Sequence, residues 1–248
     1  MDLKACDFNV PAQGRFGGRA QVACSQCALG NLCLPRGLDD RQIEQFERIV
    51  NKSRPIQKGE HIFRAGDSFR SIAAVRSGCF KSYVINAEGE EQVLGFHLPG
   101  EIIGLDAIHT QTHLASVMAL DTSAICSLNF TSVTEMARSL PELQTELFRV
   151  MSQQIAELEA NSGDLSAEQR IARFLLSLSE RFSRRGYSDK EFNLSMSRRD
   201  IASHLRLATE TVSRVLARFQ ESGVVQVNRK NIVIQDHDAL ELAATNSV

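Results

Sequence analysis

The sequence contains no long apolar run. Hydrophobic residues make up 43% of its 248 positions, which is ordinary for a protein with a packed core. No stretch approaches the roughly 18 apolar residues that a membrane span needs. The first residues lead into no apolar segment of the kind that a secretory signal contains. These absences argue against a membrane-spanning or secreted protein, and we expect a cytoplasmic one.

Internal repeats, low-complexity tracts and a nucleotide- or flavin-binding fingerprint are also lacking. The missing fingerprint argues against an electron carrier or redox enzyme, so we expect a protein that is not an enzyme and has no catalytic residues. The length of 248 residues allows one large domain or two small ones.

Charge is distributed unevenly along the chain. The formal net charge is only −2, but residues 167–230 carry 13 Lys and Arg against 7 Asp and Glu. A basic module on an acidic chain is typical of a nucleic-acid-binding domain. The alternative is a solvated basic surface without a partner.

The first half of the sequence indicates an antiparallel β-roll. Residues 1–37 are rich in Gly and Cys, and Leu38–Val50 predicts a short amphipathic helix. Short β-rich runs then follow over residues 54–130, separated by turn signals such as Asn86–Gly89. Regular short strands with such turns are typical of a roll or barrel.

Beyond the predicted roll the apolar period becomes helical. Pro141 fits the first turn of a helix, and the pattern stops near Asn161–Asp164, while a second helical run covers Ala167–Phe182. A single apolar stripe on a long helix is a candidate dimer seam, although it can also pack onto the chain's own roll. The stripe consists of Leu143, Leu147, Val150, Met151, Ile155 and Leu158.

Residues 196–219 predict a helix-turn-helix. Ser197 is suited to cap a first helix, a break follows at Arg206–Ala208, and a second helix begins near Thr209. The second helix turns one apolar face inward, which consists of Val212, Val215, Leu216 and Phe219.

The opposite face of this second helix carries Glu210, Ser213 and Arg214. Arg can donate two hydrogen bonds to guanine and Glu can accept one from cytosine, so these residues are candidates for reading bases in the major groove. Taken alone, Glu210 and Arg214 are equally well explained as a surface ion pair. Residues 223–234 then predict a two-stranded wing with Arg229 and Lys230 at its tip, suited to phosphate contacts.

Three cysteines lie close together near the start of the sequence, as Cys24-x2-Cys27-x5-Cys33. Thiolates are soft ligands for iron–sulfur clusters, zinc or copper, and either a four-iron cluster or a tetrahedral zinc needs a fourth ligand. Cys6, Cys79, Cys126 or a His could supply it. The residues alone leave iron–sulfur and zinc equally open, with a free redox thiol pair as a third alternative.

Together these stretches resemble the FNR branch of the CRP/FNR superfamily of transcription regulators, over nearly the whole chain. The cysteine motif followed by Leu34-Pro35 matches the branch's N-terminal motif. The remaining matches are Pro55–Gly59, Ala65–Asp67, Arg76–Gly78 and Gly95–Gly100 in the roll, and Glu210–Arg214 in the recognition helix.

The resemblance implies an oxygen-responsive regulator of anaerobic gene expression. Cys24, Cys27, Cys33 and Cys126 would ligate one 4Fe–4S cluster, and Glu210, Ser213 and Arg214 would read DNA. The implied partners are a second copy of the chain, a palindrome with TTGAT-type half-sites in double-stranded DNA, and RNA polymerase, which such an activator contacts. The implied α+β fold has an N-terminal antiparallel β-roll of the cyclic-nucleotide-binding type, a long dimerisation helix and a C-terminal winged helix-turn-helix.

The resemblance also sets domain boundaries. Residues 1–37 would bind the cluster, 38–139 would form the sensory β-roll, 140–166 the dimerisation helix and 167–248 the DNA-binding domain. We expect no cyclic nucleotide, because His113 stands where relatives that bind cyclic AMP hold its phosphate with Arg, and a lone His is a poor replacement for a guanidinium.

The sequence departs from the family pattern at three places. Arg206 replaces the usual Gly of the turn, where a positive φ is strained. Ala208 replaces the usual Ser or Thr cap, and we expect Thr209 to take over that role one residue later. The dimer helix lacks its usual apolar continuation, and Leu158 stands where typical members have an acidic residue, so we expect more dimer without the cluster than in those members.

Overall fold

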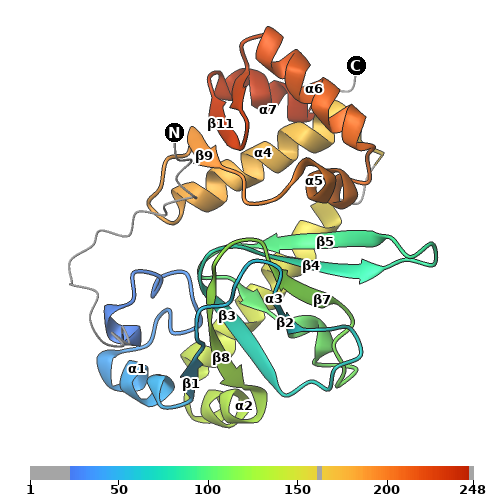
Figure 1. Ribbon diagram of the computed structural model, residues 1–248. Helices are drawn as coiled ribbons and strands as arrows, with labels where there is room; N and C mark the ends of the chain where they lie inside the picture. Colours follow the sequence, from blue (N-terminus) through green and yellow to red (C-terminus); the bar gives the residue numbers. More distant parts are fainter. Residues whose placement is uncertain (1–22, 161–163, 246–248) are drawn as a thin grey trace. The chain divides into compact units, whose positions relative to one another are not determined.

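The computed structural model describes residues 23–160 and 164–245 (Figure 1). The chain divides into two compact units, of which the first comprises the residues up to 80 together with 97–151. The second unit comprises residues 81–96 together with those from 152 onward. An antiparallel β-sheet domain, a long helix and a C-terminal helix-turn-helix follow one another along the chain, so the predicted α+β class is confirmed.

A four-stranded antiparallel sheet forms the centre of the first unit. Its strands are β1 (Val50–Lys52), β3 (Ser71–Ser77), β6 (Ile102–Ile103) and β8 (Ala124–Asn129), and their order is β1-β8-β3-β6. Strands β2 (His61–Phe63) and β7 (Ser116–Ala119) form a second antiparallel pair. The short helical elements of this unit are η1 (Cys24–Gln26), α1 (Asp40–Glu47), η2 (Leu105–Ala107) and α2 (Phe130–Ser139).

The pleat of β3 separates two hydrophobic cores, because successive side chains of a strand point to opposite faces. Ile72 and Ala74 belong to a core that also takes in α1, α2 and the start of the long helix α3 (Pro141–Ala160). Ala73 and Val75 belong to a second core inside the roll. Helix α1 begins at the capping box of Asp39 and Gln42.

The apolar stripe of α3 divides between two environments. Leu143 is fully buried, and Leu147 and Val150 pack against the first core. Further along the helix, a patch of apolar side chains is exposed, and we call it the α3 patch: Phe148, Met151, Ile155 and Leu158. The interpretation that the stripe packs on the chain's own roll is therefore confirmed for its first half, while its exposed second half remains the candidate dimer seam.

The second unit contains the C-terminal helices, a small sheet and a hairpin. The hairpin consists of β4 (Phe80–Ile85) and β5 (Glu91–His97), of which residues 81–96 belong to this unit. The sheet has the order β10-β11-β9. Its strands and the helices of the unit are α4 (Ala167–Ser183), β9 (Glu191–Asn193), α5 (Arg198–Leu205), α6 (Thr209–Glu221), β10 (Val225–Asn228), β11 (Asn231–Ile234) and α7 (His237–Thr245).

The predicted wing is confirmed within residues 223–234, where β10 pairs with β11, and β9 adds a third strand to its sheet. One local prediction for this unit needs correction. Thr209 does not cap α6: the N-cap is Ala208, which has no side-chain oxygen to accept a hydrogen bond from the helix. The predicted strain at Arg206 is confirmed, since this residue ends α5 with φ 55° and ψ 48°.

Among the residues that the structure describes, no helix is both long enough and apolar enough to cross a membrane.

Candidate cysteine site and DNA-binding surface

The segment that carries the first three cysteines is folded by short-range backbone hydrogen bonds. The amide of Gly30 donates to the carbonyl of Cys27 at 3.0 Å, and the amide of Cys33 donates to the carbonyl of Leu29 at 3.0 Å. Leu34 follows directly and is completely buried in the core under α1 and α2. These bonds curl the segment, and Leu34 holds it against the roll.

Cys126 comes to the same place from the middle of the central sheet. It lies opposite Lys52 of β1 on one side and opposite Ala74 of β3 on the other. Residues that are directly opposite in a sheet share a face, and Ala74 belongs to the core beneath the cysteine segment. The register of β8 therefore turns Cys126 toward that segment.

The four cysteines predicted as ligands line one small hollow. Cys24, Cys27, Cys33 and Cys126 surround it together with Arg76 and apolar side chains, among them Phe46, Val50 and Leu128. The hollow has a volume of only about 40 Å³, so the cysteine segment has to move outward to admit an inorganic cluster. All four are free thiols and partly buried.

The other two cysteines are placed differently. Cys79 is completely buried, its thiol faces the carbonyl of Phe80 at 3.7 Å, and it does not line the hollow. Cys6 lies outside the described residues. Among the described cysteines, Cys126 is therefore the one that lies with the N-terminal three. This is the set that the family resemblance implies and that the residues alone left open.

Burial makes two of the thiols of this hollow hard to ionise, those of Cys24 and Cys33. It raises the pKa of Cys24 to about 11, with a further contribution from the nearby Glu47 carboxylate. It also raises the pKa of Cys33 to about 12, although a backbone hydrogen bond from Leu34 opposes the shift. A metal that binds here has to displace protons, which is usual for thiolate sites.

Three charged residues around the hollow were not singled out from the sequence. Lys52 pairs with Glu47 at 2.8 Å, and the Lys52 side chain is only 10% exposed. Arg76 lines the hollow itself. Only the long-range pairing of β1, β3 and β8 brings these residues to the cysteines, so no local sequence signal identifies them.

The predicted DNA-reading residues lie together on the outer face of α6. Glu210, Ser213 and Arg214 are exposed, whereas Val212, Val215, Leu216 and Phe219 are buried on the opposite face. A guanidinium nitrogen of Arg214 lies 3.4 Å from the hydroxyl of Thr211.

The wing supplies further exposed cations. Arg229 and Lys230 are exposed at the turn between β10 and β11. The second helix of the motif and the wing together form a surface with the residue types that contact bases and phosphates.

Comparison with known proteins agrees with this geometry. A family model of the Crp-like helix-turn-helix domain matches residues 169–243, and one of the cyclic nucleotide-binding domain matches residues 53–139. The electron transport regulator A of Shewanella oneidensis is 43% identical over 91% of this chain and 92% of its own length. The fumarate and nitrate reduction regulatory protein of Escherichia coli is 40% identical over 90% of each chain.

The chain belongs to the FNR-type branch of the CRP/FNR family of transcription regulators. It is therefore a DNA-binding helix-turn-helix regulator. Among solved structures, FixK2 from Bradyrhizobium japonicum has the same fold, with a TM-score of 0.73 and 24% identity over 81% of this chain and all of that one.

In this FNR-type regulator, His113 fills part of the interior of the roll. Its ring stacks on Phe63 with centroids 3.6 Å apart and is only 4% exposed. Burial lowers the pKa of His113, while Asp106 and Asp67 raise it less. Burial thus disfavours the protonated form of this imidazole.

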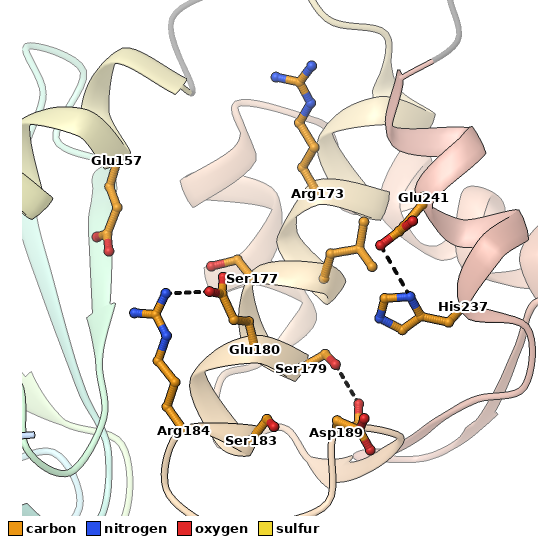
Figure 2. Close-up of a pocket in the computed structure, with 11 residues that line it drawn as sticks. Glu157, Arg173, Ser177, Ser179, Glu180, Ser183, Arg184, Asp189, His237 and Glu241 are labelled. Atoms are coloured by element: carbon orange, nitrogen blue, oxygen red, sulfur yellow. Dashed lines mark hydrogen bonds and ion pairs between the residues drawn. The ribbon is translucent and has the colours of Figure 1, made fainter. Parts of the chain in front are cut away.

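The regulator also has a wide polar hollow of about 720 Å³, lined mainly by α4 and α7 (Figure 2). Within it, Arg184 forms an ion pair with Glu180, and the ring of His237 lies 3.4 Å from the carboxylate of Glu241. His237, Asp238 and Glu241 are close enough for a common cation, but all three come from one partly exposed turn of α7. We assign no ligand to this hollow.

Proposed function

We propose that this regulator senses oxygen through a 4Fe–4S cluster bound by Cys24, Cys27, Cys33 and Cys126, and controls anaerobic gene expression. The observation that carries the proposal is the hollow that these four thiols share. They come from a curled N-terminal segment and from a strand about a hundred residues later in the chain, and four thiolates are the usual ligand set of such a cluster.

The donor set fits an iron–sulfur cluster better than other metals. Among the described residues, the lining consists of the four thiols, Arg76 and otherwise largely apolar side chains, without a His, and an apolar surrounding limits the access of water to a cluster. When bound, the cluster supplies a sensitivity to oxygen that no side chain of the chain has. The chain's own residues hold it: Leu34 anchors the cysteine segment, and the pairing of β8 fixes Cys126.

We propose that binding of the cluster favours a homodimer. Its ligands order the cysteine segment, residues 24–33, against the roll, because ligand binding free energy contributes to folding. The same core packs on Leu143, Leu147 and Val150 of α3, the helix of the proposed dimerisation segment 140–166. The α3 patch would then pair with its copy and set two DNA-binding domains, residues 167–248, about one turn of DNA apart.

The proposed target is a palindrome with TTGAT-type half-sites. Arg214 and Glu210 would make base contacts and Ser213 a base or phosphate contact. RNA polymerase is the proposed further partner at promoters. We propose that no cyclic nucleotide binds, because His113 is buried against Phe63 and, unlike a guanidinium, offers no permanent charge to a phosphate.

The experiment is cluster loading under strict anoxia followed by exposure to air. We expect about four iron and four sulfide per chain, and at least about tenfold weaker binding to a TTGAT-type duplex after air, since a monomer keeps one half-site. A loaded sample that binds DNA equally well in air would contradict oxygen sensing.

A zinc-stabilised regulator that binds DNA constitutively is the second candidate, since the same four thiols would also suit zinc. Metal analysis of the anaerobically purified protein separates the two. Zinc without acid-labile sulfide would overturn the iron–sulfur proposal and support this alternative.

A further inference from the structure

The described side chains around the cysteine hollow carry more positive than negative charge. Cys126 lies directly opposite Lys52 in the pairing of β1 with β8, so both side chains share a face of the sheet. Arg76 reaches the hollow from β3. In the part of the chain that the structure describes, one carboxylate accompanies these two cations, that of Glu47, and it accepts a hydrogen bond from the backbone amide of Cys24.

Lys52 is buried to a degree that a Lys rarely reaches without a reason. Its side chain is 10% exposed, and Glu47, its partner at 2.8 Å, is 30% exposed. A partly buried ion pair contributes little to stability by itself, since desolvation offsets the attraction. The pair is therefore poorly explained as a stabilising bridge between the end of α1 and β1.

The two cations and the carboxylate shift the pKa of the thiols in opposite directions. Burial raises the pKa of Cys126 most, Arg76 and Lys52 lower it, and Glu47 raises it. Glu47 likewise raises and Lys52 lowers the pKa of Cys24, after the larger effect of burial. All three charges thus lie close enough to act on the sulfur atoms.

We infer that Lys52 and Arg76 are positioning charges that stabilise four thiolates ligating a cluster, and that Glu47 partly offsets them and so sets how firmly iron is retained. This inference rests on the proposed function. Four thiolates bring four negative charges into a partly buried site, and the positive charge of the iron–sulfide core offsets them only in part. The uncompensated remainder is costly. Two cations and one anion leave a net positive charge around the site. Net charge is one of the factors that set the reduction potential of an iron–sulfur cluster.

The test measures the rate at which a chelator removes iron under strict anoxia from protein loaded with ferrous iron and sulfide. We expect Lys52→Met and Arg76→Gln each to speed the loss about threefold to tenfold, the scale of one charge acting through a partly solvated interior. Glu47→Gln keeps a hydrogen-bond acceptor for Cys24 and should slow the loss by a similar factor. Lys52→Arg keeps the positive charge and should lose iron at the wild-type rate.

The expected changes in the rate of iron loss have opposite signs, so the variants distinguish an electrostatic effect from damage to the fold. Lys52→Met with Glu47→Gln removes one charge of each sign and should return close to the wild-type rate. Arg54→Met removes a cation whose side chain is 76% exposed and paired with Glu60, so it is the matched control and should change nothing. If Lys52→Met fails to load, Glu47→Gln and Arg76→Gln decide the question.

The inference is overturned if the Lys52, Arg76 and Glu47 variants all shift the rate in one direction, or if none shifts it while the wild type loads. A wild type that takes up neither iron nor sulfide is a different result, since it overturns the proposed function itself.

Discussion

The ammonium nitrogen of Lys81 lies 2.8 Å from a carboxylate oxygen of Asp200, and 2.5 Å from one of Glu91. Asp200 also belongs to the capping box at the start of α5, where its other oxygen accepts from the amide of Ser197 at 2.9 Å. The hydroxyl of Ser203 on the same helix bridges to the amide of Val93 and the carbonyl of Glu91. Within the second unit, the β4–β5 hairpin is therefore tied to the first helix of the DNA-binding motif.

Replacement of Lys81 by Met should weaken this tie. The Lys81 side chain is 5% exposed, but its partners are 16% and 41% exposed, so solvent screens part of the loss. We expect the free energy of unfolding to fall by about 1 to 2 kcal/mol in urea titrations. Lys58 is exposed, and Lys58→Met should cost less than about 0.5 kcal/mol; equal effects of the two variants would contradict the tie.

The two cysteines outside the N-terminal motif should differ sharply in cluster loading. Cys126→Ala removes a thiol that lines the hollow, whereas Cys79→Ala removes one that does not. We expect the first variant to lose the brown anaerobic chromophore and the second to retain about four iron atoms per chain. The reverse pattern in anaerobic absorption spectra would assign the fourth ligand to Cys79.

Arg214 and Arg229 should affect DNA binding in different ways. Arg214→Ala removes a proposed base contact and should cost about 1 to 3 kcal/mol on a TTGAT-type duplex but little on unrelated DNA. Arg229→Ala removes a proposed phosphate contact and should weaken binding to both duplexes alike. The slope of the logarithm of the binding constant against the logarithm of the salt concentration should become smaller by about 1. Fluorescence anisotropy at several salt concentrations measures both, and a uniform loss in both variants would argue against base reading by Arg214.

Acid should destabilise the roll through His113. Its folded-state pKa is lowered mainly by burial, so between that value and about pH 6.5, the usual value, the unfolded chain binds more protons. The stability it contributes is thus complete above about pH 6.5 and is lost as the pH falls.

His113→Phe keeps a ring on Phe63 and should flatten the pH dependence of unfolding, measured in urea from neutral pH downward. Part of the slope should remain, because burial also lowers the pKa of His204. His109 is exposed, and His109→Gln should leave the slope unchanged; a slope unaltered in His113→Phe would show that this residue does not control it.

The exposed end of α3 should control association without the cluster. Leu158 is 68% exposed, and Leu158→Asp would place like charges across the proposed seam. We expect sedimentation at tens of micromolar to show residual dimer in the wild-type apo protein, and at least about tenfold weaker association in the variant, because a buried Leu contributes about 1.5 to 3 kcal/mol. Leu242, 59% exposed on α7, provides the control Leu242→Asp, and wild-type apo protein that is purely monomeric would contradict the expectation.

Local chemistry made much of this fold predictable from the sequence. Ser197 caps α5 as expected, because its hydroxyl accepts from the amide of Asp200 three residues later. The left-handed conformation of Arg206 also follows from its place in a turn that usually needs Gly. The prediction that Thr209 caps α6 was wrong, because the helix begins one residue too early for the Thr209 hydroxyl to cap it.

Long-range pairing was the part that the sequence could not supply. Nothing near Cys126 or Cys79 in the chain distinguishes them, and only the register of β8 against β1 and β3 brings Cys126 to the hollow. For the same reason, the sequence did not indicate that Glu47, Lys52 and Arg76 lie near the cysteines. Strand β9 was missed because three residues are too few for an alternating pattern to stand out.

Helix α3 presents two faces within the first unit. Leu143, Leu147 and Val150 pack among the side chains beneath the cysteines, whereas Phe148 and Met151 on the same turns are exposed. Neighbouring side chains of a helix are carried by one hydrogen-bonded backbone, so a rearrangement of the core that rotates these turns also changes how Phe148 and Met151 are presented. The exposed face can therefore report on the state of the cysteine segment.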